Sequence, residues 1–154
     1  MDVPGGSTFG LEHLVLDYNG TLACDGVLKE GVLSRLETLS SVLSVHVITA
    51  DTHGSVHDAL ESPFVTIHVI EKCDQDKQKE AYVMQLGTHA CVAVGNGFND
   101  ALMLKASALG VVLMQEEGCA TRTLLASDLA FNSIENLLDA LLTPNRIVAS
   151  LRNS

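Results

Sequence analysis

The chain has 154 residues, of which 47% are hydrophobic and 4% aromatic, and its formal net charge is -10 with histidine neutral. This length favours a single domain over residues 1–154 with a sizeable core, and we expect its first ten residues to be flexible. The negative charge disfavours nucleic acid and anionic membrane surfaces as partners. Four cysteines without a CxxC pair, and apolar runs too short to span a membrane, predict a cytoplasmic protein.

The first predicted element is a buried strand that ends in an acidic residue. The apolar run Leu14–Leu16 leads directly into Asp17, and Gly20 permits a sharp turn before the hydroxyl of Thr21. A strand-end aspartate suits two roles, as an oxygen ligand of a hard cation or as a nucleophile toward phosphorus. Asp17 taken alone is equally compatible with a residue that ends a strand in a turn.

Strand and helix patterns alternate along the rest of the chain. The pair Asp25-Gly26 is typical of a tight turn and predicts a small hairpin above Asp17. Apolar spacing predicts helices at 29–43, 53–60, within 72–86, and at 101–108, 118–126, 134–142 and from Pro144 onward, and strands at 45–49, 65–70, 91–94, 110–114 and 129–131. The alternation predicts an α/β protein, a three-layer Rossmann-like sandwich with a mostly parallel sheet of five to six strands.

Polar residues follow several of the predicted strands. Asp17, Thr49 and the loop Gly95–Asp100 each stand at a carboxyl end, and the 72–86 segment adds lysines. Because the carboxyl ends of parallel strands share one edge of a sheet, we expect these residues to line one crevice. A carboxylate nucleophile, a hydroxyl, a cation and an acidic loop form a phosphoryl-transfer set. Thr49 is also compatible with a strand-end cap, and helical lysines with a solvated face.

In this order the four stretches resemble the motifs of the haloacid dehalogenase-like hydrolase superfamily. Asp17–Thr21 looks like its first motif and Thr49 like its second. Lys79, or alternatively Lys77, resembles the third, and Gly95–Asp100 resembles the fourth. The first motif and the compact chain look closest to the soluble, capless relatives of P-type ATPases.

The resemblance spans roughly residues 12–142 and implies a magnesium-dependent phosphohydrolase that acts through an aspartyl-phosphate. It makes Asp17 the nucleophile, with Asn19, Thr49 and Lys79 as the other catalytic residues. The implied phosphate-binding residues are Thr49, Ala50, Lys79, Gly20 and Thr21, and the implied ligands of Mg²⁺ are Asp17, the carbonyl of Asn19, Asn96 and Asp100. The expected partner is a phosphorylated substrate.

Two residues depart from the pattern of the superfamily. Its phosphatases usually carry a second aspartate, an acid–base group, where this chain has Asn19, although P-type ATPases also lack it. Asn96 stands where the fourth motif usually has an aspartate, so one formal charge is lost. We therefore expect weak magnesium binding and slow turnover. The alternatives are a binding or regulatory protein with a phosphatase fold and, less favoured by the motif order, a receiver-type signalling domain.

The predicted crevice has little chain to cover it. The 22–31 segment and the single helix before the fourth strand are too short to form a cap domain, so we expect a minimal cap and an open site. A bulky substrate or a neighbouring subunit would exclude water from such a site. Because the last helix carries Ile147, Val148 and Leu151, we expect an apolar surface there and a homo-oligomer.

Overall fold

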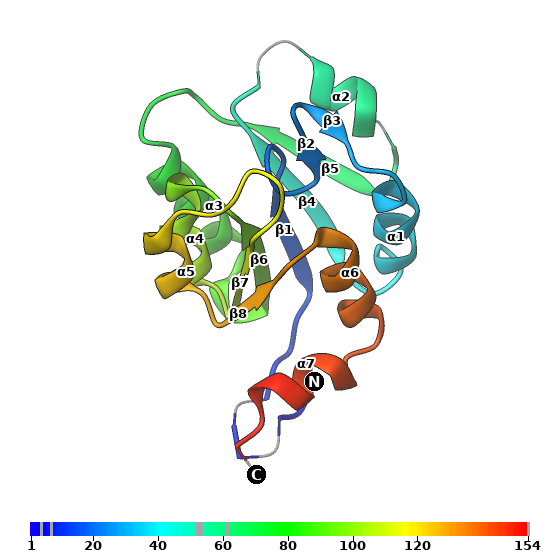
Figure 1. Cartoon of the computed structure of the whole chain (residues 1–154), viewed down its shortest axis with the longest axis vertical. Helices are drawn as coiled ribbons and strands as arrows, with labels where there is room; N and C mark the ends of the chain where they lie inside the picture. Colours follow the sequence, from blue (N-terminus) through cyan, green and yellow to red (C-terminus); the bar gives the residue numbers. More distant parts are fainter. Residues whose placement is uncertain (4, 7, 52–53, 61, 154) are drawn as a thin grey trace.

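The centre of the molecule is a six-stranded parallel sheet in the order β5-β4-β1-β6-β7-β8 (Figure 1). The structure is a computed structural model, which describes residues 1–3, 5–6, 8–51, 54–60 and 62–153. The strands are β1 (His13–Asp17), β4 (Ser44–Thr49), β5 (Val65–Val69), β6 (Cys91–Gly95), β7 (Leu109–Leu113) and β8 (Leu129–Phe131). The apolar runs predicted these strands to within about one residue, and the predicted parallel α/β architecture is confirmed.

Helices cover both faces of the sheet and complete three layers (Figure 1). One face carries α1 (Val32–Leu39), α2 (Ser55–Leu60) and α6 (Ile134–Leu142), and the other carries α3 (Gln75–Leu86), α4 (Ala101–Ala106) and α5 (Thr121–Ala126). Side chains of β1 alternate between the two layers, so Leu14 and Leu16 pack with the first group and Val15 with the second. The predicted helix over 53–60 begins at a residue outside the described set.

The strand order reverses at β1. The chain first builds β4 and β5 on one side of β1, then crosses back and builds β6, β7 and β8 on the other side. The loops that leave β1 and β6 therefore diverge to opposite faces, which opens a crevice at the carboxyl ends of these strands. Asp17 is the last residue of β1 and lies at this reversal.

The predicted hairpin above Asp17 is present. Its strands, β2 (Ala23–Cys24) and β3 (Val27–Leu28), are antiparallel, and Asp25 and Gly26 form the turn with φ of 51° and 79°. This hairpin is the insertion between β1 and α1, and α3 with the short turn η1 (Thr88–Ala90) connects β5 to β6. The predicted minimal cap is therefore confirmed.

Both ends of the chain pack against the core near the foot of the sheet (Figure 1). The amino group of Met1 donates a hydrogen bond of 2.6 Å to the carbonyl of Phe9. In the last helix, α7 (Asn145–Leu151), Ile147 is buried and Leu151 packs on the same core. The expectation of a free apolar surface is therefore wrong for Ile147, which belongs to the protein's own core, whereas Leu151 is half-buried against that core. Within the described residues, no helix combines the length and apolar character needed to cross a membrane.

Candidate active site

A cavity of about 800 Å³ opens where β1, β4 and β6 end. Its wall is formed by Asp17, Tyr18, Asn19, Gly26, Thr49, Ala50, Asp51, Ser55, Lys72, Gln75, Lys79, Asn96, Gly97 and Asn99. The structure thus brings together six of the nine site residues that the sequence indicated. Gly20, Thr21 and Asp100 do not line the cavity and lie behind its wall.

A buried lysine joins two carboxylates at the floor of this cavity. The Lys79 Nζ atom lies 2.8 Å from Asp17 Oδ1 and 2.7 Å from Asp100 Oδ1. Burial by itself would lower the pKa of Lys79, but the two carboxylates raise it above its ordinary value, so the side chain stays cationic. Lys77 is exposed and does not line the cavity. Of the two candidate lysines, Lys79 is therefore the one that contacts Asp17.

The positive charge of Lys79 does not fully compensate the two carboxylates of Asp17 and Asp100. Burial and the nearby carboxylate of Asp100 raise the pKa of Asp17 to about 7, against the opposing effect of Lys79. Thr21 Oγ1 donates a long hydrogen bond of 3.4 Å to Asp17 Oδ2. The triad of Asp17, Lys79 and Asp100 has a formal charge of -1 when both acids are ionised, so a further cation would stabilise it.

Asp100 fixes the turn that follows β6. Its Oδ2 atom accepts hydrogen bonds from the backbone amides of Asn96 (3.0 Å) and Gly97 (2.9 Å), and the side chain has no exposed area. A β-carbon at Gly95 would lie 2.4 Å from Asp100 Cγ, so only glycine allows the carboxylate to approach the strand end. Asp100 therefore helps to position two parts of the cavity wall, the Lys79 side chain and the turn at Asn96.

The first and fourth motifs are in direct contact. A β-carbon at Gly20, whose φ is 77°, would lie 2.4 Å from Asn96 Nδ2, so glycine is required there as well. Asn96 Nδ2 donates to the carbonyl of Gly118 over 3.1 Å, and Gln115 Nε2 donates to the carbonyls of Gly20 and Thr21 over 3.0 Å. The loop after β7 thus holds both motifs together, a role of Gln115 that its sequence context does not indicate.

Thr49 uses its hydroxyl oxygen locally. The backbone amide of Asp51 donates a hydrogen bond of 3.1 Å to Thr49 Oγ1, and Ser55 Oγ donates to Asp51 Oδ2. This is the strand-end cap that the sequence left open as an alternative. The cap uses Thr49 Oγ1 as an acceptor, so the hydroxyl proton is still available to a ligand in the cavity.

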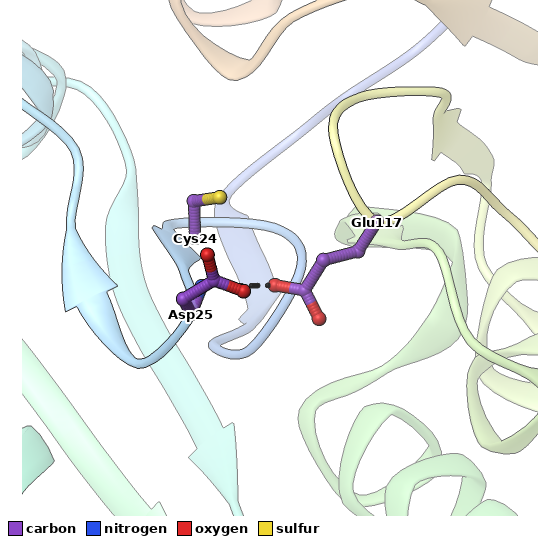
Figure 2. Close-up of side chains that lie close together, drawn as sticks. All are labelled: Cys24, Asp25 and Glu117. Atoms are coloured by element: carbon purple, nitrogen blue, oxygen red, sulfur yellow. Dashed lines mark hydrogen bonds between the residues drawn. The ribbon is translucent and has the colours of Figure 1, made fainter.

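The hairpin is fastened to the loop after β7 at the rim of the cavity. Figure 2 shows Cys24, Asp25 and Glu117 side by side, and the backbone amide of Asp25 donates to Glu117 Oε2 over 3.3 Å. Lys29 Nζ adds an ion pair of 2.8 Å to Glu116. Partial burial and the adjacent carboxylates raise the pKa of the Cys24 thiol, which favours its neutral form. These contacts anchor the hairpin, whose Gly26 forms part of the cavity wall.

Several residues of the cavity wall were not predicted. Ser55, Lys72 and Gln75 lie outside the four motifs. Asn99 belongs to the fourth motif but was not named as a site residue, and its Nδ2 donates to Gln75 Oε1 over 2.8 Å. Lys72 follows β5 by three residues, so the same strand-end rule that indicated Thr49 could have found it. The others depend on the packing of α2, α3 and the turn η2 (Phe98–Asp100), which local sequence does not specify.

No protein-family model matches the chain. Two curated proteins of Methanocaldococcus jannaschii do match it. The uncharacterized protein MJ0073 is 42% identical over 62 residues, which are 40% of this chain and 67% of that protein. The uncharacterized protein MJ0072 is 46% identical over 39 residues, which are 25% of this chain and 89% of that protein.

Solved structures share the architecture at low sequence identity. The cobalt-bound deoxy-D-mannose-octulosonate 8-phosphate phosphatase of Haemophilus influenzae has a TM-score of 0.67 and 11% identity, with 87% of this chain and 88% of that chain covered. The corresponding phosphatase of Moraxella catarrhalis, solved with magnesium, phosphate and KDO, has a TM-score of 0.62 and 16% identity, with 93% and 94% covered.

The catalytic domain of the CPx-ATPase CopB-B has a TM-score of 0.58 and 19% identity, with 75% of this chain and 46% of that chain covered. A putative HAD family hydrolase of Streptomyces avermitilis has a TM-score of 0.62 and 16% identity, with 97% of this chain and 90% of that chain covered. At such identities the likeness concerns the fold, and the haloacid dehalogenase-like fold predicted from the motifs is confirmed. The chain therefore belongs to the same family as MJ0073 and MJ0072 of Methanocaldococcus jannaschii, and its fold is that of the haloacid dehalogenase-like hydrolases.

Proposed function

We propose that the protein is a phosphohydrolase that moves the phosphoryl group of a phosphomonoester first to Asp17 and then to water. The observation that carries this proposal is the buried Lys79 held between Asp17 and Asp100, at 2.8 Å and 2.7 Å, on the floor of an open cavity. An ion triad with a purely structural role has no need of a cavity or of a place at the reversal of strand order. The shared fold with phosphatases supports the same reaction class.

In the proposed reaction, a carboxylate oxygen of Asp17 attacks phosphorus and the bond from phosphorus to the ester oxygen breaks. Lys79 Nζ holds Oδ1 of Asp17 at 2.8 Å, whereas the hydrogen bond from Thr21 to Oδ2 is longer, at 3.4 Å, so we assign Oδ2 as the attacking atom. The Thr49 hydroxyl and the Lys79 ammonium hold the phosphoryl oxygens. Water then hydrolyses the aspartyl-phosphate, and inorganic phosphate leaves.

The residues of the site fit a magnesium ion. The excess negative charge of the triad and the raised pKa of Asp17 indicate a place where a cation stabilises the folded protein. The oxygen atoms that would hold Mg²⁺ are the Asp17 carboxylate, the Asn19 carbonyl and the Asn96 side-chain oxygen. When bound, the ion would offset negative charge on the phosphoryl oxygens. Direct ligation by Asp100 stays a prediction, because its oxygens already bond Lys79 and the Asn96 turn.

The proposed turnover is slow because Asn19 lies in the cavity where the phosphatases have their acid–base aspartate. An amide cannot protonate the leaving group or activate water at neutral pH. Gly20 and Thr21 lie behind the wall, so we assign them to the shape of the site rather than to contact with phosphate. The alternative, a binding or regulatory protein, rests on Asn19 together with the neutral Asn96.

The test compares the wild type with Asp17→Asn on a panel of phosphomonoesters, with and without Mg²⁺. We expect low, Mg²⁺-dependent phosphate release from the wild type and none from the variant. Asp25→Asn is the matched control, because Asp25 is an exposed carboxylate outside the cavity wall, and it should retain the wild-type rate. Equal phosphate release by wild type and Asp17→Asn under every condition would favour the binding protein over the enzyme.

A homo-oligomer also remains a proposal. Its support is the minimal cap, since a neighbouring subunit or a bulky substrate would shield the cavity from water. Light scattering at micromolar concentration measures the oligomeric state. A monomer that hydrolyses small phosphoesters efficiently would contradict this proposal.

A further inference from the structure

The cavity has room for more than a phosphoryl group. Its volume of about 800 Å³ falls within the range of about 300–1,000 Å³ typical of sites for whole small molecules. Within the described ranges, its wall carries two basic side chains, Lys79 at the floor and Lys72 on the loop that follows β5. Since Lys79 is committed to Asp17 and Asp100, Lys72 is the cation available to the rest of a substrate.

Lys72 differs from Lys79, the other basic residue of the described cavity wall, because no described residue forms an ion pair with it. The basic residues that form ion pairs are Lys29, Arg35, Lys79 and Arg122. Lys72 forms no ion pair with any of the residues that the structure describes, although the chain carries a net charge of -10. An unpaired cation that borders the cavity of an acidic protein is well placed to attract an anionic ligand group.

The backbone on both sides of Lys72 is fixed by one side chain of α3. Gln78 Oε1 accepts a hydrogen bond of 3.1 Å from the amide of Glu71, and Gln78 Nε2 donates to the carbonyls of Glu71 (3.2 Å) and Cys73 (2.5 Å). An exposed loop would otherwise lose conformational entropy on binding, which weakens affinity. Gln78 therefore holds Lys72 at the rim before a ligand arrives.

Neighbouring groups set the limits of this site. Glu71 and Asp74 flank Lys72 in sequence and weaken its field, while Gln75 and Asn99 add neutral amides to the same cavity wall. A second anionic group of a ligand is therefore favoured near Lys72.

We infer that the substrate carries a second anionic group on the side of its leaving group and that Lys72 binds this group, with Gln78 as a positioning residue. This inference depends on the proposed function in one respect, which is that the phosphoryl group of the substrate binds at Asp17. A lysine ammonium is a point charge without the planar fork of arginine. Carboxylate and a second phosphate therefore share the chemistry that Lys72 recognises, and the experiment distinguishes them.

The first test measures binding and needs no turnover. Calorimetry in the presence of Mg²⁺ compares propylphosphonate with 3-phosphonopropionate and with propane-1,3-bisphosphonate. We expect the wild type to prefer the doubly anionic compounds by about five-fold, as for one partly exposed ion pair. Lys72→Met should remove this preference and Gln78→Leu should reduce it. Lys77→Met is the matched control, because it removes an exposed lysine outside the cavity, and it should keep the preference.

The second test is kinetic and uses 3-phosphoglycerate and glycerol 3-phosphate, which differ in a carboxylate. Lys72→Met should raise the KM for 3-phosphoglycerate relative to glycerol 3-phosphate by about five-fold, with a smaller change in the ratio of kcat values. Because each comparison is made within one variant, a general loss of folded protein cancels from the ratio.

The outcomes separate this inference from the proposed function. A wild type without preference, an equal loss in Lys72→Met and Lys77→Met, or no binding of any phosphonate overturns the inference. A binding preference that Lys72→Met abolishes, in a wild type without phosphatase activity, supports the inference and overturns the hydrolase. A preference confined to the carboxylate or to the bisphosphonate supports it and identifies the anion.

Discussion

Helix α3 contacts the sheet through two polar clusters, one buried and one half-buried, which are one turn apart and differ in charge. Lys79 reaches Asp17 at the carboxyl end of β1 and forms the ion triad of the cavity. Tyr82 forms a hydrogen bond of 2.8 Å with His46 Nδ1, and His46 Nε2 lies 3.2 Å from His13 Nδ1 at the amino end of the same strand. The first cluster is ionic and opens to a cavity, whereas the second, which we call the neutral cluster, is centred on His46, whose pKa is lowered by burial.

Burial acts on the two clusters in opposite directions. Burial, with Asp100, raises the pKa of Asp17 to about 7, and burial, with His13, lowers the pKa of His46 to about 4. The histidine therefore stays neutral and its hydrogen bonds stabilise the fold, while the triad keeps charges that removal from water makes unfavourable. The neutral cluster therefore stabilises the fold, whereas burial makes the ionic cluster costly, and we attribute it to the proposed chemistry of the cavity.

The largest effect that we expect comes from removing the cation of the ionic cluster. Lys79→Met leaves Asp17 and Asp100 without their shared partner, so phosphatase activity should fall by at least about 10²–10³-fold. The free energy of unfolding should fall by about 3–5 kcal/mol, and by less at pH values below neutrality, where one carboxyl binds a proton. Denaturant unfolding and phosphate release measure the two effects. Lys77→Met serves as control, and a stable, active Lys79→Met protein would contradict the assignment.

The next largest effect should come from adding a carboxyl group beside the ionic cluster, and it concerns the rate of turnover. Asn19→Asp restores a group that can transfer protons, an effect of about 10²–10⁴-fold where geometry is favourable. We expect faster turnover and a shorter-lived phosphoenzyme in acid-quench trapping than in the wild type. An unchanged rate would show that the missing carboxylate does not limit this protein.

The neutral cluster should lose its stabilising effect at acidic pH, when His46 binds a proton. Because the folded pKa of His46 is about 4 and its ordinary value is 6.5, the unfolded chain binds more protons between these pH values. Stability should therefore fall as the pH is lowered from about 6.5 toward about 4, by about 2–3 kcal/mol from this group.

The measurement is the free energy of unfolding of wild type minus that of His46→Gln, over the same pH range. Asp17, whose pKa is raised, shifts stability in the opposite sense, but its contribution is common to both proteins and cancels. A flat difference for His46→Gln would mean that its burial does not hold it neutral.

The two clusters also show what sequence can predict. Asp17, Thr49, Lys79 and Asn96 could be placed in one cavity, because apolar runs identify the strands and the ends of parallel strands share one edge. The helical phase that brings Lys79 rather than Lys77 to Asp17 required the structure. It depends on how α3 is rotated against the sheet, and the lysines alone do not specify that rotation.

The histidine cluster could not be found in this way. His13 and His46 are 33 residues apart, and Tyr82 is a further 36 residues along the chain. Their contact depends on the register of β1 with β4 and on the packing of α3, and a histidine in an apolar strand carries no local sign of its partner. The burial of Ile147 was missed for a related reason, since an apolar helix stripe suits an interface as well as a core.

The smallest expected effect is also the sharpest test of whether the two clusters are separate. Tyr82→Phe keeps the ring, whose centroid lies 4.7 Å from that of His68, and removes the hydroxyl that pairs with His46 Nδ1. A buried ring nitrogen without a partner should lower the free energy of unfolding by about 1–2 kcal/mol. Because two carboxylates hold Lys79 independently of Tyr82, phosphatase activity should change by no more than about two-fold. If activity instead falls as far as in Lys79→Met, then Tyr82 determines the position of α3. The two clusters would then act together to align Lys79 with Asp17.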